Sequence, residues 1–239
     1  MAVLSGINPV LEALRARHPL ERILVARGAG GTRLQQIIDS AREAAVPVRF
    51  ERRDALDRLA GTPAHQGVVA LGAAKRYAEL EDVADAAKLI VILDGVEDPH
   101  NLGAIIRTSH AAGASAVVIP ERRSAGLTDV VAKAAAGALE YLPVVRVGNV
   151  NRALEALRDR GFRIYGLDAR GSEEYDRIEY GSPAALVVGG EGKGLHELVR
   201  RHCDALVRIP MAGKISSLNV SVATGIVLFE WKRRHSRAP

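Results

Sequence analysis

Three polar segments of the chain carry the side chains that could take part in chemistry, and each follows a short apolar run. The first segment, residues 94–107, places Asn101 where a helix is expected to begin and Arg107 in an otherwise apolar part of that helix. Asn101 could cap the helix or contact a ligand, and the pattern alone does not choose between these roles. A guanidinium group in apolar surroundings needs an acidic partner or a ligand, so we expect Arg107 to be functional.

The second segment, residues 189–194, has four glycines in six positions and includes Glu191. Glycine permits tight turns and lets the backbone approach a ligand closely. The spacing matches neither the dinucleotide-binding fingerprint nor the Walker A motif, which disfavours a nucleotide-dependent oxidoreductase. Glu191 could be a simple turn residue, but an acidic side chain directly after an apolar strand is also well placed to be a site residue.

The third segment, residues 210–219, leads into an apolar helix at the end of the chain. We expect one of Ser216 and Ser217 to cap this helix, because serine is a favoured capping residue. The other serine, together with Asn219, is expected to face the same crevice as Glu191. These residue types define a polar crevice, and by themselves they do not specify a reaction.

Short apolar strands that alternate with helices must position the three segments. The predicted strands are 89–93, 116–119, 144–147, 163–167, 184–188 and 205–209, and the predicted helices are 102–112, 128–139, 151–160, 197–201 and 218–234. This alternation is typical of a parallel sheet that is covered by helices on both faces. Ligands of such folds bind beyond the carboxyl ends of the strands, which is where the polar segments begin.

The first third of the chain is predicted to be a separate basic domain. Residues 1–76 hold 12 Lys and Arg against 7 Asp and Glu, which accounts for the whole formal charge of +5. We predict a small α/β domain over 1–72, with Asn8 and Thr32 capping its first two helices, a linker over 73–87 and a larger domain over 88–239. An excess of positive charge in one domain favours an acidic partner such as nucleic acid.

Composition excludes several other classes of protein. With 48% hydrophobic and 26% charged residues the chain is globular, and its single cysteine, Cys203, allows neither an intramolecular disulfide nor a zinc site built mainly from thiolates. The sequence shows no signal-peptide pattern and no apolar run that could span a bilayer, so we expect a soluble cytoplasmic protein. The basic residues 232–237 are interpreted as a solvated helix end rather than as an RNA contact.

Taken together and in order, the polar segments resemble the three motifs of the SpoU-type (TrmH/RlmB-like) RNA ribose 2′-O-methyltransferases of the SPOUT superfamily. The matching residues are DGVEDPHNLGAIIR at 94–107, LVVGGEGKGL at 186–195, and IPM and SLNVSVA at 209–211 and 217–223. The first domain, with the sequence His-Gln-Gly at 65–67, resembles the L30e-like RNA-binding domain of the RlmB-like branch, the bacterial 23S rRNA (guanosine-2′-O-)-methyltransferases. One departure is Gly190, at a position where many members have alanine.

The resemblance implies an α/β SPOUT catalytic domain with a parallel sheet and a C-terminal trefoil knot, which acts as a homodimer and uses S-adenosyl-L-methionine without a metal. It implies that Gly189, Ile209 and Leu218 line the cofactor pocket. The implied catalytic and RNA-positioning residues are Asn101, Arg107, Glu191, Ser217 and Asn219. Two roles are open for Arg107: the base proposed for the family, or a ligand of the adjacent phosphate, which suits a guanidinium with a pKa above about 12.

The implied reaction is methylation of a ribose 2′-hydroxyl in RNA. The small first domain favours a guanosine in the peptidyl-transferase P loop of 23S rRNA as the target. A tRNA guanosine 2′-O-methyltransferase and an antibiotic-resistance rRNA 2′-O-methyltransferase are the alternatives within the family. A non-catalytic RNA-binding assembly factor is a remote alternative, and the intact set of polar residues argues against it.

Overall fold

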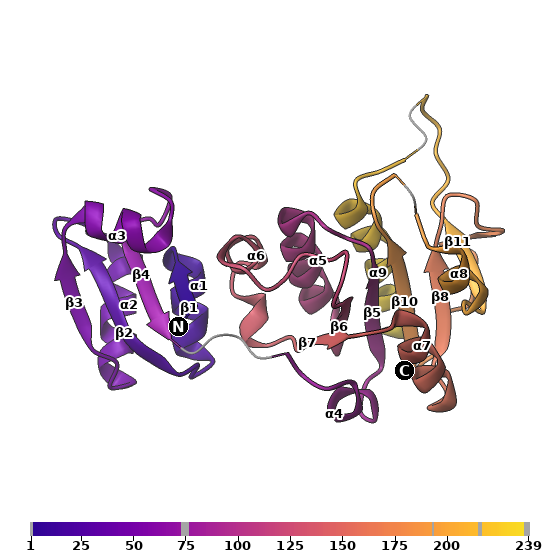
Figure 1. The fold of residues 1–239 in the computed structure, drawn as a ribbon, viewed down its shortest axis with the longest axis horizontal. Helices are drawn as coiled ribbons and strands as arrows, with labels where there is room; N and C mark the ends of the chain where they lie inside the picture. Colours follow the sequence, from indigo (N-terminus) through magenta and orange to yellow (C-terminus); the bar gives the residue numbers. More distant parts are fainter. Residues whose placement is uncertain (1, 73–76, 193, 215–216, 237–239) are drawn as a thin grey trace. The chain divides into compact units, whose positions relative to one another are not determined.

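The computed structural model describes the chain except for residues 1, 73–76, 193, 215–216 and 237–239, and it shows two compact units. The small unit consists of residues 1–76 and 127–141, and the large unit of residues 77–126 and 142–239. Each unit combines a sheet with helices packed on it (Figure 1). None of the described helices has both the length and the apolar composition needed to cross a membrane.

The small unit has a four-stranded sheet in the order β1-β4-β2-β3, in which β2 and β3 are parallel and the other pairs are antiparallel. Its elements are β1 (Ala2–Ser5), α1 (Ile7–Arg15), β2 (Leu20–Ala26), α2 (Thr32–Glu43), β3 (Val48–Glu51), α3 (Arg53–Ala60), β4 (Val68–Gly72), α6 (Asp129–Ala135) and η1 (Ala138–Glu140). Strand β1 was not predicted, because a four-residue strand is too short to show a clear alternation.

Both helix caps predicted for the small unit are wrong. Gly6 precedes α1 and Gly31 precedes α2, and neither helix has a side-chain cap. The two glycines have φ angles of 103° and 122°, which are strained for a residue that carries a side chain. Asn8 and Thr32 therefore lie inside the first turns of their helices.

The His-Gln-Gly sequence has a structural role in the small unit. His65 is fully buried, its Nε2 atom lies 2.9 Å from Asp57 Oδ1, and its Nδ1 atom accepts a hydrogen bond from the Gly67 amide at 3.0 Å. The Gln66 Oε1 atom accepts a hydrogen bond from the Ile7 amide at 3.0 Å. These bonds hold the turn that leads into β4, so His65 is committed to the interior and does not face a ligand.

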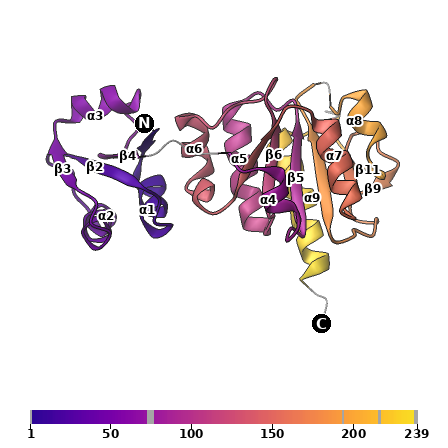
Figure 2. The same ribbon diagram turned by 60° about the horizontal axis from the view of Figure 1, so that its bottom comes forward.

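The large unit contains a seven-stranded sheet in the order β7-β6-β5-β10-β8-β11-β9, with every pairing parallel. Its elements are α4 (Leu80–Ala84), β5 (Leu89–Asp94), α5 (Pro99–Ala112), β6 (Ala116–Pro120), β7 (Val144–Val147), α7 (Val150–Asp159), β8 (Arg163–Leu167), β9 (Glu173–Glu174), β10 (Ala184–Gly189), α8 (Glu197–Arg201), β11 (Ala205–Arg208) and α9 (Val220–His235). The predicted parallel α/β sheet is confirmed (Figure 2).

Two predicted segments of the chain take a different form in the structure. The helix predicted over 128–139 is divided into α6 and η1, because Ala136 and Gly137 have left-handed φ angles of 50° and 96°. Residues 73–76 of the predicted linker lie outside the described part of the chain. The following residues form α4, whose Leu80 and Ala84 are buried in the core of the large unit.

The centre of the large sheet explains where its polar segments meet. Strands β5 and β10 are buried along their whole length, as expected for neighbouring parallel strands with helices on both faces. Ile90, Ile92 and Val187 pack in a core cluster with residues of α4, α7 and α8. Because the strands are parallel, all of their carboxyl ends lie along one edge of the sheet, here called the carboxyl edge.

Candidate functional site

Asn101 is placed for contacts outside its own helix. Asp98 is the N-cap of α5, and its Oδ1 atom accepts a hydrogen bond from the His100 amide at 2.9 Å. Pro99 then occupies the first turn, where the missing N–H has no intrahelical role. The capping alternative for Asn101 is therefore wrong, and its buried side chain is available to neighbouring loops.

One hydrogen-bond network joins the three polar segments. Asn101 Nδ2 donates to Glu191 Oε1, and Asn219 Nδ2 donates to Asn101 Oδ1 at 3.0 Å. The residues come from α5, from the loop after β10 and from the start of α9. Two amides and one carboxylate that are far apart in the sequence therefore meet at the carboxyl edge, as the sequence predicts.

Asn219 also performs the capping role that was predicted for a serine. Its Oδ1 atom accepts hydrogen bonds from the Ser221 amide at 2.9 Å and from the Ser221 hydroxyl at 2.6 Å, which makes Asn219 the N-cap of α9. Ser217 is exposed two residues earlier, so the prediction of a serine cap is wrong for it. Ser216 lies outside the described residues. Capping fixes the Asn219 side chain, so that its amide nitrogen points towards Asn101.

The segment from residue 209 to residue 219 must cross the carboxyl edge. Strands β8 and β10 separate β11 from β5 in the sheet, yet Asn219 contacts the helix that follows β5. Ile209 is half-buried at the start of this segment, and Met211 and Leu218 expose 39% and 38% of their surface. Ile209, directly after β11, and Leu218, directly before Asn219, therefore adjoin the same edge as the polar network.

Arg107 lies apart from the network. It is exposed on α5, and it has no acidic partner among the residues that the structure describes. The premise that Arg107 lies in apolar surroundings is wrong, because six residues at about 100° each turn it roughly 120° away from the buried Asn101. Its guanidinium group is exposed at the surface of α5. Its functional role stays a prediction.

The glycine-rich loop is closed by contacts within its own backbone. A Cβ atom on Gly189 would lie 2.1 Å from the carbonyl carbon of Gly194, and one on Gly190 would lie 2.0 Å from the Gly95 oxygen. The Gly194 amide donates to the Gly190 carbonyl at 3.1 Å. The sequence predicted that the glycines let the backbone approach a ligand closely. In the structure they let the backbone after β10 approach the backbone after β5, so the two loops lie together.

Two buried carboxylates that the prediction missed hold the end of this loop. Asp94, at the end of β5, accepts a hydrogen bond from the His196 amide at 2.8 Å and lies 2.9 Å from His196 Nδ1. Asp168, just after β8, lies 3.4 Å from Arg200 Nε. Because β5 and β8 flank β10, the two acids anchor the chain from both sides of the loop. Like Glu191, both residues are acidic and stand at the end of an apolar strand, so the pattern that identified Glu191 could also have identified them.

Other reactive groups in the described chain do not form a second site. Burial raises the pKa of the Cys203 thiol to about 12, so it is not a thiolate nucleophile at neutral pH. The described residues contain no group of three or more His, Cys, Asp or Glu that could hold a metal ion.

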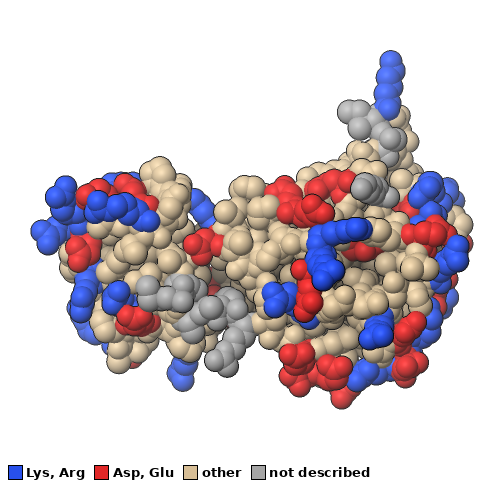
Figure 3. All heavy atoms as spheres, in the orientation of Figure 1, with Lys and Arg blue, Asp and Glu red and all other residues tan. Residues whose placement is uncertain are grey.

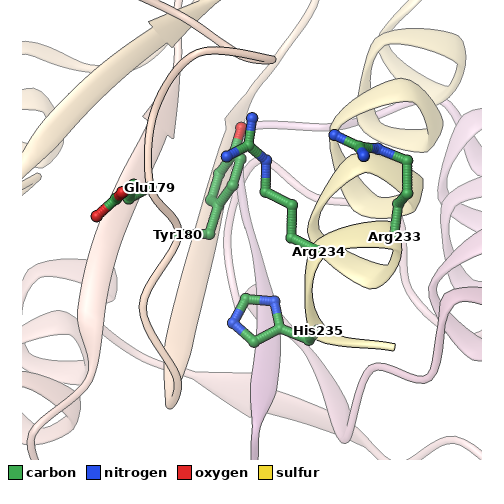
Figure 4. A pocket seen from close by; sticks show the side chains of 5 residues that line it. All are labelled: Glu179, Tyr180, Arg233, Arg234 and His235. Atoms are coloured by element: carbon green, nitrogen blue, oxygen red, sulfur yellow. The ribbon is translucent and has the colours of Figure 1, made fainter. Parts of the chain in front are cut away.

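The basic end of α9 lies beside a shallow hollow lined by Glu179, Tyr180, Arg233, Arg234 and His235 (Figure 4). Arg233 and Arg234 both donate to Glu230, and Arg234 also donates to the Asp176 carbonyl. These arginines are satisfied within the chain, which argues against an RNA contact at this helix end. None of the predicted site residues lines the hollow.

Comparison with known proteins places both units in one functional class. A family model described as the SpoU rRNA Methylase family matches residues 88–229, and one described as RNA 2′-O ribose methyltransferase substrate binding matches residues 3–78. YacO of Bacillus subtilis (strain 168), whose name assigns it to the TrmH family of tRNA/rRNA methyltransferases, is 44% identical over 237 residues. That match covers 97% of this chain and 95% of YacO.

Two solved structures are similar over almost the whole chain. The AdoMet-bound rRNA methyltransferase from Sinorhizobium meliloti is 29% identical with a TM-score of 0.83, and the match covers 99% of this chain and 88% of that one. The SpoU methyltransferase AviRb from Streptomyces viridochromogenes, in complex with AdoMet, is 25% identical with a TM-score of 0.84, covering 99% of this chain and 91% of AviRb. The likeness therefore includes both units.

Proposed function

The chain belongs to the SpoU/TrmH family of S-adenosylmethionine-dependent RNA 2′-O-ribose methyltransferases of the SPOUT superfamily, and from that premise we propose that its substrate is 23S rRNA. The proposed target is a guanosine in the peptidyl-transferase P loop, as in the RlmB-like branch. The rRNA methyltransferase from Sinorhizobium meliloti, which is similar over 99% of this chain, supports an rRNA target. A tRNA guanosine is the alternative, which the name of YacO leaves open.

The network of Asn101, Glu191 and Asn219 carries the assignment of the active site. It unites the three motif segments at the carboxyl edge, where ligands of parallel sheets bind. The Asn101 amide is held by the Glu191 carboxylate, and the Asn219 amide is held by its capping bonds to α9. Side chains with fixed orientations of this kind can align a ribose without first having to move. Ser217, exposed beside Asn219, is assigned to the same positioning role.

The carboxyl edge also fits the methyl donor. We assign its pocket to Gly189, Ile209 and Leu218, and the partly exposed apolar surfaces of Leu218 and Met211 suit the faces of an adenine ring. Glu191 offers a carboxylate near a cationic ligand, and among the described residues it has no basic partner. When bound, S-adenosylmethionine supplies a methyl group on a positively charged sulfur, which requires no metal.

Arg107 is assigned to the substrate phosphate. A guanidinium remains protonated, so it is suited to holding a phosphate next to the reacting ribose and poorly suited to removing a proton. The 2′-hydroxyl proton then passes to that phosphate or to water while the oxygen forms its bond to the methyl carbon and the carbon–sulfur bond breaks. The lack of an acidic partner for Arg107 in the described chain leaves its charge available for this contact.

We assign the chain to a homodimer through α9. Val222 and Phe229 expose 51% and 47% of their surface, and they lie on one face of the helix because they are seven residues apart. Gly225 and Ile226 lie between them on that face. An exposed apolar stripe of this kind is typical of an association surface, and sedimentation of Val222→Asp against the unchanged chain tests it.

The proposed function is tested by methyl transfer in vitro. The purified chain, S-adenosylmethionine and an unmodified 23S rRNA transcript should give one 2′-O-methylguanosine in the peptidyl-transferase region, located by mass spectrometry of nuclease fragments. Unmodified tRNA transcripts are the control substrate. Methylation of tRNA alone would replace the proposed target by the alternative, and methylation of neither would contradict the choice of both substrates.

A further inference from the structure

An aromatic side chain lies open to solvent at the edge of the small unit. Phe50 exposes 53% of its surface, whereas Phe162 in the large unit exposes 3%. The chain has only three phenylalanines among 239 residues. A single exposed apolar residue is ordinary on a protein surface, so the surroundings of Phe50 decide whether its position has a function.

The exposure of Phe50 follows from its place on an edge strand. Strand β3 pairs only with β2, and Phe50 lies opposite Val25 in that register. Val25 is fully buried in the core between the sheet and helices α1 and α2, and Val48 on β3 packs against the same core. Phe50, two residues further along the strand, is not part of that core, so its ring is free beside the strand end.

Three exposed arginines surround the strand end that carries Phe50. Arg27 follows β2 directly. Its backbone amide donates a hydrogen bond to the Glu51 carbonyl at 2.8 Å, and its Nε atom donates one to the Phe50 carbonyl at 3.4 Å. Arg49 belongs to β3 itself, and Arg53 is the first residue of α3. Basic side chains, with acidic ones among them, lie over this end of the small unit (Figure 3).

These three guanidinium groups differ from others in the same unit. In the described part of the chain, Arg27, Arg49 and Arg53 have no acidic partner. By contrast, Arg52 lies 3.1 Å and Arg58 3.5 Å from the carboxylate of Asp54. Guanidinium groups without a carboxylate partner in the described chain therefore lie around the strand end that carries Phe50, with Arg49 on the opposite face of the sheet from the ring because successive side chains of a strand alternate.

The loop that follows Arg27 leaves the approach to this surface open. Gly28, Gly30 and Gly31 each have no atom within 4 Å of the position that a Cβ would occupy, apart from their chain neighbours. These three positions therefore add no side chain to the surface next to Arg27.

We propose that Arg27, Phe50 and Arg53 form a surface that binds an unpaired nucleotide of the RNA substrate, with its base stacked on the Phe50 ring and neighbouring phosphates held by the two arginines. The inference rests on the proposed function, since it requires an RNA substrate. The excess of positive charge in residues 1–76 favours RNA over a protein partner or a second copy. Base-paired RNA hides its base faces within the helix, so stacking on a side chain selects loops, bulges and ends.

Two separate signatures test this surface in the full-length chain. Phe50→Ala should weaken binding of a single-stranded 20-nucleotide RNA by about 5- to 100-fold, the usual range for one stacked base, and should leave binding of the matching duplex nearly unchanged. Phe50→Tyr retains the ring and should bind within about twofold of the unchanged chain. Arg53→Gln should lower the slope of log Kd against log salt by about 0.7 for the single strand, whereas Phe50→Ala should leave the slope unaltered.

The matched control is Arg42→Gln, which removes another exposed arginine of the small unit, whose Nη1 atom lies 3.9 Å from Asp39 Oδ1. Thermal melting and titration with S-adenosylmethionine show whether each variant is folded. Single-strand binding by Phe50→Ala within twofold of the unchanged chain, or equal losses for single strand and duplex, would overturn the inference. The proposed function is tested separately, by methyl transfer from the unchanged chain to the 23S transcript. The binding assays use other RNAs, so their outcome does not depend on which RNA is the methylation target.

Discussion

The polar groups at the two proposed sites, one in each unit, differ in whether they already have partners. At the carboxyl edge of the large unit, Asn101, Glu191 and Asn219 are bound to one another. At the β3 end of the small unit, Arg27 and Arg53 are exposed and have no acidic partner among the described residues. The difference matches two tasks, since aligning reacting atoms requires a rigid arrangement and binding RNA requires charge that is not already neutralised.

Arg107 is the exception in the large unit, because it is exposed and lacks an acidic partner in the described chain. Arg107→Ala should lower kcat/KM for RNA methylation by about 100-fold or more, as expected when a donor to the reacting group is lost. Binding of S-adenosylmethionine, measured by calorimetry, should not change. Arg152→Ala, an exposed arginine on α7, is the control and should retain full activity. Normal turnover of the Arg107 variant would remove it from the catalytic set.

Substitution of Asp94, which holds the end of the glycine-rich loop, tests whether cofactor binding by the large unit depends on a fixed loop. Asp94→Asn weakens the contact with His196 and should raise the Kd of S-adenosylmethionine by about 5- to 10-fold, the effect of losing about 1 kcal/mol from a charged hydrogen bond. At saturating cofactor, kcat should stay close to normal because the catalytic network is intact. Asp85→Asn, at a carboxylate that is 83% exposed, should change neither constant. A large fall in kcat without a change in Kd would contradict a positioning role for Asp94.

The paired arginines of α9 give the smallest expected effect. A hydrogen bond from Arg233 lowers the pKa of Glu230 from 4.5 to about 2. A carboxylate with a lowered pKa stabilises the folded chain above its ordinary pKa, and that contribution is lost as the pH falls towards 2. The difference in unfolding free energy between the unchanged chain and Glu230→Gln should therefore shrink from pH 5 to pH 2. Glu43→Gln, at the exposed end of α2, is the control, and a difference that does not vary with pH would refute this account of Glu230.

Sequence patterns predicted the large unit well because its strands are short, apolar and separated by helices. All six predicted strands begin and end within one residue of a strand in the structure, namely β5, β6, β7, β8, β10 and β11. Periodicity could not predict β9, which has two residues, or the break at Ala136. The trefoil knot rests on the resemblance alone, because no local pattern encodes the threading of a chain.

The predicted meeting of Asn101, Glu191 and Asn219 at one edge is confirmed, whereas the predicted helix caps were wrong. Asn101, Glu191 and Asn219 meet because parallel strands bring their carboxyl ends to one edge. Residue type favoured serine as the cap of the last helix, yet Asn219 is the cap, since several residue types can cap and the position depends on the loop path. Asp94 and Asp168 were missed because their role depends on neighbours that are distant in the sequence. The catalytic and cofactor-binding roles of all the predicted site residues remain predictions.

The most direct test of the account maps 2′-O-methylation in a strain that lacks this protein. Across all rRNA and tRNA, the account predicts the loss of a single mark, on a guanosine of the peptidyl-transferase P loop of 23S rRNA. The mark should return with the unchanged chain and not with Arg107→Ala. Loss of a tRNA mark with intact rRNA, or an unaltered methylation map, would contradict it.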